Sequence, residues 1–361
     1  MEGIKGARCL VTGGTGYLGR CICKALLAAG AAEVRTLDRV APPADAPMPR
    51  GVRVFTGDIR TPADVAAAMM GCDIVIHSAS FGMSGREMLQ LHMTRDANIK
   101  GTMVILAAAL KLGVARLVYT STYNAVFGDK PIVNGDETLP LFPPSRHVDE
   151  YSRTKALAER AVLQANCDAL GTCAIRPAAI YGPGEARHFP RIARLAAAGA
   201  VCFSVGPPST LVDWVHGDSA ASAHVLAAAA LRPGGAARGQ AYFISDDRPV
   251  NQTEFLRPLL TALGVRTPRI WLPVWLLMWV AYAIQIVCII TWRLTGYLPP
   301  PLLLPAEVLK VGVTHYFSIA KARRELGYKP IVDPDEGMRA TVAALMAKRA
   351  QQGGAAAKKT S

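Results

Sequence analysis

The stretch Thr12-Gly13-Gly14-Thr15-Gly16-Tyr17-Leu18-Gly19 lies between an apolar run at residues 8–12 and a helical pattern at residues 16–29. Three of its glycines are spaced three residues apart. Gly13 permits a tight turn, Gly16 lets the backbone approach a pyrophosphate, and Gly19 lets the helix pack closely on the strand. The N-terminus of the helix offers free N–H groups and the positive end of its dipole to phosphates. We therefore predict a dinucleotide-binding turn, in which Tyr17 and Leu18 also contact the cofactor.

The first half of the chain alternates short apolar strands with helices. The expected strands are residues 8–12, 34–38, 52–55, 73–77, 116–120 and 171–176, and the expected helices include 16–29, 98–112 and 151–166. This alternation predicts an α/β fold of the Rossmann type, a doubly wound parallel sheet covered by helices on both faces.

Beyond Pro183 the alternation loosens, and we expect a smaller substrate lobe at the carboxyl ends of the strands, where ligands of such sheets bind. The chain is divided into a Rossmann domain (1–182), a substrate lobe (183–268, completed by 306–350), an apolar membrane-associated segment (269–305) and a flexible basic tail (351–361).

Composition narrows the class of protein. Hydrophobic residues make up 51% and charged residues 19%, which is typical of a folded chain and not of a disordered one. The net charge of +13 suits nucleic acid or an anionic membrane, but basic runs interleaved with aromatic residues are lacking, which argues against nucleic acid. The eight cysteines show no zinc spacing, so we expect reduced core thiols and no metal site. Residues 1–6 leave no room for a signal peptide ahead of the first strand.

Two acidic positions follow strands and are candidates for contact with the cofactor. Asp38 ends the second strand, where a carboxylate accepts both ribose hydroxyls of NAD and repels the extra phosphate of NADP. Arg39 follows it and could hold that phosphate, so NADP is an alternative. Asp58 and Ile59 follow the third strand and are placed to meet the adenine, although an ordinary loop acid fits the spacing equally well.

Tyr151-Ser-Arg-Thr-Lys155 places a phenol and an ammonium group one helical turn apart on the helix after the fifth strand. A free phenol has a pKa near 10, and lowering it by about three units requires about 4 kcal/mol, which two nearby positive charges, the lysine and the oxidised nicotinamide, can supply. Thr120-Ser121-Thr122 ends the fifth strand, so a hydroxyl there could hydrogen-bond the substrate oxygen. Ser121 and Thr122 face opposite ways, so only one can point into the cleft.

These motifs resemble the extended short-chain dehydrogenases/reductases, and among them the 3-beta-hydroxysteroid dehydrogenase/isomerase family. The resemblance covers nearly the whole chain and rests on residues 12–19, 57–58, 98–102, 119–122, 151–155, 176–184, 215–218 and 320–330.

The resemblance implies roles for individual residues. Tyr151 would be the general base or acid, Lys155 would bind the nicotinamide ribose and tune Tyr151, and Pro177 would begin the segment that shields the nicotinamide. Thr122 would occupy the position of the catalytic hydroxyl, with Ser121 as the alternative. His77-Ser-Ala-Ser80 departs from the family's His-Leu-Ala-Ala, which leaves the loop after the fourth strand open.

Residues Ile270 to Trp292 form an uncharged stretch of 23 residues between Arg269 and Arg293. As a helix it would be about 35 Å long, enough to cross a bilayer, and its tryptophans suit a lipid–water interface. The alternative is a buried core helix. Because residues 315–346 should complete the substrate lobe, we favour a helix in the interface or a re-entrant hairpin over a single crossing.

The last four residues, Lys358-Lys359-Thr360-Ser361, resemble a dilysine retrieval signal, although a solvated basic tail fits them as well. Together with the apolar segment they predict an enzyme at the endoplasmic reticulum membrane with a cytosolic catalytic domain.

The sequence therefore predicts an NAD-dependent oxidoreductase acting on the CH–OH group of a steroid or sterol-like substrate. One alternative is a nucleotide-sugar epimerase or reductase, which would share the glycines, Tyr151 and Lys155 but gives no reason for the apolar stretch. Another is a non-catalytic module that senses NAD at a membrane, against which the retained Tyr151 and Lys155 argue. The expected partners are the small-molecule substrate and a membrane, and the sequence leaves a homodimer open.

Overall fold

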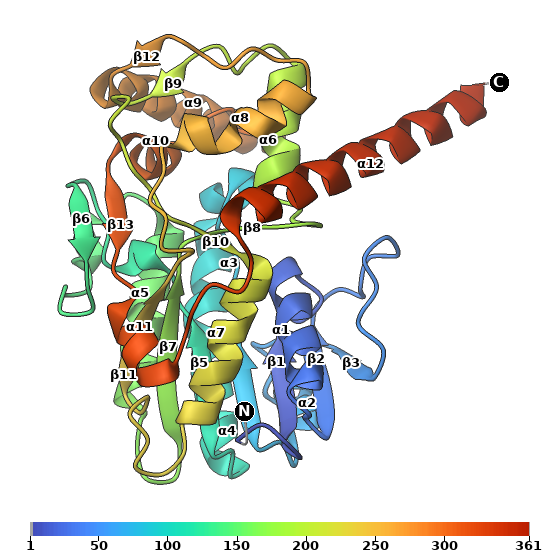
Figure 1. Cartoon of the computed structure of the whole chain (residues 1–361), viewed down its shortest axis with the longest axis vertical. Coiled ribbons are helices and arrows are strands. Elements are labelled where there is room, and N and C mark those ends of the chain that lie inside the picture. The colour runs from blue at the N-terminus through green and yellow to red at the C-terminus, as the bar shows by residue number, and fades with distance from the viewer. Residues whose placement is uncertain (1–2, 361) are drawn as a thin grey trace.

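The computed structural model describes residues 3–360, and the side chains of residues 3–351. At its centre is a sheet of seven parallel strands in the order β11-β7-β5-β4-β1-β2-β3 (Figure 1). The strands are β1 (Arg8–Thr12), β2 (Glu33–Asp38), β3 (Val52–Thr56), β4 (Ile74–His77), β5 (Arg116–Thr120), β7 (Gly171–Pro177) and β11 (Gln240–Ile244). The strand order reverses between β1 and β4, so the ligand crevice is expected at the carboxyl ends of these two strands.

Helices cover both faces of the sheet, as the sequence predicts. One face carries α1 (Tyr17–Ala28), α7 (Gly217–Ala230) and α11 (Ala320–Leu326), and the other carries α2 (Pro62–Met69), α4 (Gly101–Lys111) and α5 (Glu150–Gln164). The helix expected over 98–112 instead begins as a π-helical turn at Asp96–Lys100, preceded by α3 (Leu91–Arg95). The helix α2 was not predicted.

Part of the range assigned to the substrate lobe returns to the central sheet. Strand β11, within residues 183–268, pairs with β7, and α7 packs against α1 and β5. The alanine-rich sequence of α7 has little polar–apolar periodicity because α1, the sheet and α11 surround it on several sides. The two parts of the molecule are therefore interleaved along the chain.

The remaining elements lie toward the carboxyl ends of the strands, in the upper half of Figure 1. They comprise α6 (His188–Ala197), α8 (Gln252–Ala262), α9 (Val274–Thr295), α10 (Pro305–Gly312), and the strand pairs β8 (Ala179–Tyr181) with β10 (Trp214–His216), β9 (Ser204–Val205) with β12 (Trp271–Leu272), and β6 (Ile132–Gly135) with β13 (His315–Phe317). Helix α12 (Pro334–Thr360) packs on α8 and then projects from the body. The flexible tail and the dilysine signal fall on residues 351–361, almost all of whose side chains lie outside the described residues.

Helix α9 carries most of the uncharged stretch. It begins after Pro273, ends at Gly296, has a hydropathy of 2.2, and is long and apolar enough to cross a membrane by length and composition. Only 17% of its most apolar stretch of 18 residues is buried. The side chains of Trp275 and Trp279 are 66% and 73% exposed, whereas Leu277 and Ala281 on the opposite side pack against α10. Helix α9 is therefore not a core helix.

Candidate active site

One cavity of about 770 Å³ runs from the glycine turn to the upper lobe. Its first part is lined by the turn after β1 and by the loops after β2, β3 and β4. Its middle part is lined by Thr122, Tyr151 and Pro177, and its far part by α6, α8 and the segment at residues 302–311. The residues predicted for cofactor and for chemistry are thus brought to one continuous space, except Lys155, which is buried and does not line it.

The glycine turn has the geometry that a dinucleotide requires. Gly13 adopts a φ of +70°, and a Cβ atom there would come within 2.7 Å of the Ala79 backbone. A Cβ atom at Gly19 would overlap the carbonyl oxygen of Gly13, so only glycine lets α1 pack this closely. At Gly16 the space is open apart from one carbonyl oxygen at 3.2 Å, and α1 begins without a side-chain cap. The first N–H groups of α1 are therefore available to phosphates.

Tyr17 and Leu18 also line the cavity. The Tyr17 hydroxyl donates to the carbonyl oxygen of Tyr181 at 3.1 Å, and its ring occupies the space above Gly182 and Gly217, where any Cβ would collide with it. Tyr17 thus ties the glycine turn to β8. This structural contact adds to its predicted contact with the cofactor.

The Asp38 carboxylate lies at the end of β2 on the cavity. It accepts hydrogen bonds from the Thr15 hydroxyl at 2.6 Å and from the Arg39 backbone N–H at 2.8 Å. The Arg39 guanidinium lies 5.8 Å from the centre of the Phe81 ring, at the same part of the cavity. Both Asp38 and Arg39, the residues from which the sequence predicts the choice between NAD and NADP, therefore line the cavity.

Asp58 lines the cavity beside Arg60, whose guanidinium lies 2.6 Å from its carboxylate. This hydrogen-bonded arginine is the main reason that the pKa of Asp58 lies below its usual value. Ile59 is buried and fills the space above Gly101, where a Cβ would collide with it. Ile59 therefore packs against Gly101, and Asp58 forms an ion pair with Arg60. The contact of these two residues with adenine stays a prediction.

Tyr151 and Lys155 are both buried in α5, and they make different contacts. The Lys155 ammonium donates to the carbonyl oxygen of Thr120 and lies 4.1 Å from the centre of the Tyr119 ring. Burial lowers the pKa of Lys155 to about 7, against the opposing charge of Glu159. Burial likewise raises the pKa of Tyr151 to about 12. The pKa lowering that the sequence analysis attributed to Lys155 is therefore not present in the protein alone, because desolvation outweighs the nearby cations.

Two residues that the sequence analysis did not assign oppose this rise. The Arg187 guanidinium and the Ser80 hydroxyl both act to lower the pKa of Tyr151, while Asp149 and Glu87 act to raise it. Arg187 lines the cavity and pairs with Glu87 at 3.3 Å. Ser80 belongs to the loop after β4, where the sequence departs from the family pattern, and this departure was the one signal that could have pointed to it.

The hydroxyl groups of Ser121 and Thr122, the two candidates for contact with the substrate oxygen, make different hydrogen bonds. The Ser121 hydroxyl donates to Glu159, which is fully buried and paired with Arg176 at 2.6 Å. The Thr122 hydroxyl accepts from the Asn124 backbone and side chain at 3.2 and 3.1 Å. Its own proton has no acceptor among the described side chains, so Thr122 keeps a donor for a ligand in the cavity.

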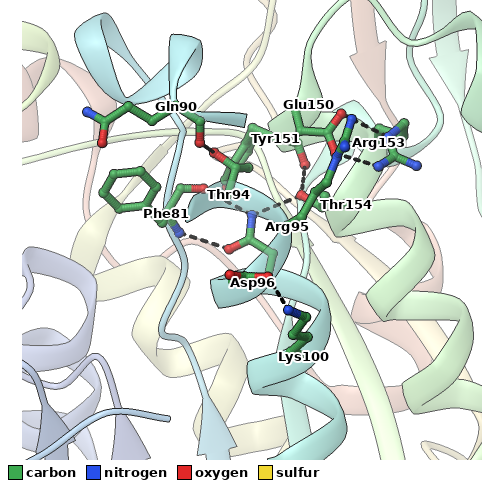
Figure 2. A network of polar contacts seen from close by, with 11 residues as sticks. Phe81, Gln90, Thr94, Arg95, Asp96, Lys100, Glu150, Tyr151, Arg153 and Thr154 are labelled. Carbon is green, nitrogen blue, oxygen red and sulfur yellow. Dashed lines mark hydrogen bonds and ion pairs between the residues drawn. The ribbon is translucent and has the colours of Figure 1, made fainter. Parts of the chain in front are cut away.

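The buried side-chain amide of Asn98 holds the start of α5 in place. Asn98 in the π-helical turn accepts from the Phe81 N–H at 2.9 Å and donates to the Phe81 carbonyl at 3.0 Å and to the Thr154 hydroxyl at 2.9 Å. Thr154 in turn donates to the Tyr151 carbonyl at 3.0 Å (Figure 2). The loop after β4, the π-helical turn and the start of α5 are thus held as one unit, which explains why this position needs an amide.

The sequence profile of the 3-beta hydroxysteroid dehydrogenase/isomerase family matches residues 10–274. The chain belongs to this family. It is 48% identical to short-chain dehydrogenase/reductase family 42E member 1 of Danio rerio, over 89% of this chain and 84% of the relative. It is 39% identical to the 3 beta-hydroxysteroid dehydrogenase/Delta 5-->4-isomerase of Mycobacterium tuberculosis, over 92% of this chain and 88% of that protein.

The family's fold recurs in solved structures of lower identity. A dTDP-glucose 4,6-dehydratase from Streptomyces venezuelae superposes with a TM-score of 0.71 at 24% identity, covering 95% of this chain and 98% of that one. A UDP-glucose 4-epimerase from Thermotoga maritima gives a TM-score of 0.70 at 19% identity, covering 94% and 99%. At these identities the likeness concerns the fold, and it agrees with the seven-stranded sheet described above.

Proposed function

We propose that the chain is an NAD-dependent oxidoreductase that acts on the CH–OH group of a steroid or sterol-like lipid, with Tyr151 transferring the hydroxyl proton. The observation that carries the proposal is that the glycine turn, Thr122 and Tyr151 line the same cavity, whose far part is apolar. Membership of the family makes an oxidoreductase of the short-chain type the coarser conclusion.

The far part of the cavity has an apolar wall that suits a lipid. A volume of about 770 Å³ for the whole cavity lies within the range of about 300–1,000 Å³ that small-molecule sites occupy. The apolar residues on its wall include Ile192, Leu195, Phe203, Leu256, Leu260, Leu303 and Val311. Burial of an apolar ligand there would be driven by removal of its surface from water.

The charges in this part of the cavity argue against a nucleotide sugar. A diphosphate needs unpaired cationic groups or free backbone N–H groups. The basic side chains here are each paired with a carboxylate, in the pairs Arg187–Glu87, Arg191–Glu307 and Lys310–Asp149. The net charge offered to a ligand is therefore small, and we favour a neutral lipid.

In this proposal the chain's own residues hold the substrate and accept its hydroxyl proton. Thr122 donates a hydrogen bond to the substrate oxygen, and Tyr151 exchanges the proton with it. Gly13, Gly16, Gly19 and Asp38 hold the dinucleotide, with Lys155 toward its nicotinamide ribose. When bound, the nicotinamide accepts the hydride, and its oxidised form adds a positive charge that favours the phenolate of Tyr151.

The test is an assay of the purified protein with NAD and NADP against 3-hydroxysteroids, long-chain alcohols and nucleotide sugars. We expect formation of reduced cofactor with a 3-hydroxysteroid and loss of it in Tyr151→Phe. Turnover of nucleotide sugars alone would contradict the substrate class. Turnover unaffected by Tyr151→Phe would contradict the assigned proton transfer.

We further propose that α9 docks the protein on a membrane, lying in the interface plane. Its exposed face carries Trp275, Trp279 and Ile286, while the other face packs on α10, next to the cavity wall at Leu303. A lipid could then enter the cavity from the bilayer.

Co-sedimentation with anionic vesicles should fall at least about tenfold in Trp275→Ser/Trp279→Ser, because each buried tryptophan contributes about 1.5–3 kcal/mol. Equal binding of the wild type and the variant would contradict this docking.

A further inference from the structure

The first turn of α5 is tied to α10 by a pair of opposite charges. Nζ of Lys310 on α10 lies 3.0 Å from Oδ2 of Asp149, and the two side chains are 19% and 7% exposed. Asp149 is also the N-cap of α5, since its carboxylate accepts from the Ser152 N–H at 2.7 Å and from the Ser152 hydroxyl at 2.9 Å. One carboxylate thus joins Lys310 to the start of the helix that carries Tyr151.

Lys310 also faces the candidate active site. Its Nζ atom lies 5.8 Å from the centre of the Tyr151 ring, and its side chain lines the cavity. Lys155, by contrast, donates to Thr120 and faces the Tyr119 ring. Lys310 is therefore an ammonium group beside Tyr151, and it lies outside residues 10–274, which match the family profile.

Helix α10 packs directly against α9. Val308 on α10 packs with Leu277 and Ala281 on α9 in one apolar cluster, and the neighbouring Val313 and Leu309 pack on Phe127. Any displacement of α9 would be transmitted through α10 to Lys310 and hence to Asp149.

We propose that Lys310 is a positioning residue that, through Asp149, fixes the first turn of α5 and so couples the place of Tyr151 to the α9–α10 unit. The consequence for turnover rests on the proposed function of Tyr151, whereas the mechanical link does not.

The charges around the pair make Lys310 the main partner of Asp149. Burial alone would favour the protonated form of Asp149, but the Lys310 ammonium and the Ser152 donors outweigh it and keep its pKa below the usual value. The two histidines nearby, His147 and His315, have pKa values lowered by burial, to about 4 for His315, so both are neutral at pH 7. The other charged groups of this turn, Glu150 and Arg153, pair with each other.

The test compares Lys310→Met with Lys310→Arg and with Arg323→Met, a control that breaks an exposed arginine–aspartate pair of 2.8 Å outside the cavity. We expect Lys310→Met to lower kcat about tenfold or more with KM for the cofactor unchanged, and to speed amide hydrogen exchange at residues 150–154. The acidic limb of its pH–rate profile should move to higher pH, since Asp149 then protonates more easily. Lys310→Arg should restore most of each effect.

The double variant Asp149→Asn/Lys310→Met should lose the shift of the acidic limb, because no buried carboxylate is left without its partner. If Lys310→Met matches Arg323→Met in hydrogen exchange and kcat, the inference is overturned. If the wild type turns over no substrate while Lys310→Met still loses protection at residues 150–154, the link stands and the proposed function fails.

Discussion

The hydroxyl of Ser121 donates its hydrogen bond to the buried carboxylate of Glu159, whereas the proton of the Thr122 hydroxyl has no acceptor among the described side chains. Sequence alone left these two neighbours as alternatives. We expect Thr122→Ala to lower kcat about 100-fold, the usual effect of losing one donor to a reacting oxygen. Thr122→Ser should retain most activity, and Ser121→Ala should change kcat only a few-fold. Steady-state kinetics of the three variants decide this, and a larger loss in Ser121→Ala than in Thr122→Ala would reverse the assignment.

The Glu159–Arg176 pair should dominate the stability of the region behind the site. Both side chains are at most 5% exposed, and the carboxylate is fully buried. Removing one partner leaves an uncompensated buried charge, so Glu159→Ala should lower the free energy of unfolding by about 3–5 kcal/mol. Urea denaturation would measure this. The exposed pair Arg257–Glu254 supplies the control, and Glu254→Ala should cost at most about 1 kcal/mol.

Lys155 should make stability depend on pH in a defined window. Burial lowers its pKa from 10.5 to about 7 in the folded protein, so above pH 7 the unfolded chain binds the proton more readily than the folded one. The contribution of Lys155 to the free energy of unfolding therefore rises with pH between about 7 and 10.5 and is constant outside that range. Relative to Lys155→Met, the wild type should gain stability as pH is raised from 7 to 10 in thermal unfolding. A difference that does not change with pH would show that Lys155 stays charged when folded.

Asp38 should control the choice of cofactor. Its carboxylate, fixed by Thr15, ends β2, where an acidic side chain would repel the 2′-phosphate of NADP, and Arg39 follows it. We expect Asp38→Ser to shift the ratio of kcat/KM for NAD over NADP by at least about tenfold toward NADP. Because Arg39 would be the group that accepts the phosphate, Asp38→Ser/Arg39→Ala should lose that gain. An unchanged ratio in Asp38→Ser would place the ribose elsewhere.

Gly19 should be indispensable for the cofactor turn. A methyl group there meets the Gly13 carbonyl and the Gly14 Cα, both backbone atoms that have no room to move. Gly19→Ala should therefore abolish binding of NADH, as followed by its fluorescence. Gly113→Ala is the control, because nothing lies within 4 Å of an added Cβ there, although its φ of +70° itself disfavours alanine. Equal NADH binding in the two variants would contradict the close packing described for α1.

The fold could be predicted largely from local patterns. The six strands expected from apolar runs all occur, with ends that differ by at most one residue. Strands β1, β4, β5 and β7 are buried parallel strands with mainly apolar sequences, whereas β3 is an edge strand and is largely exposed. The seventh strand, β11, escaped because a five-residue strand far along the chain carries no sign of which sheet it joins. Helix α7 escaped for a related reason, since it is packed on several sides and its alanines give no amphipathic period.

The candidate site was predicted only where a motif fixes the spacing. The separation of the three glycines is determined by their distance in the sequence, because they share one strand–turn–helix motif. The same holds for Tyr151 and Lys155, which share one helix. Asp38 and Thr122 were predicted because each follows or ends an expected strand. Ser80, Arg187 and Lys310 reach Tyr151 from three other segments, and their approach is decided by tertiary packing. The electrostatic state of Tyr151 was also beyond the sequence, because desolvation, which depends on every surrounding residue, outweighs the charge of its neighbour.

The central claim is that Tyr151 exchanges a proton with the hydroxyl of a steroid-like lipid while the nicotinamide takes the hydride. The most direct measurement is single-turnover formation of reduced NAD from a 3-hydroxysteroid by the wild type and by Tyr151→Phe at matched cofactor saturation. The account predicts a burst of reduced NAD in the wild type and a rate at least about 100-fold lower in the variant, with steroid and NADH binding retained. Equal rates in the two proteins, or no reduced NAD from any steroid in the wild type, would contradict it.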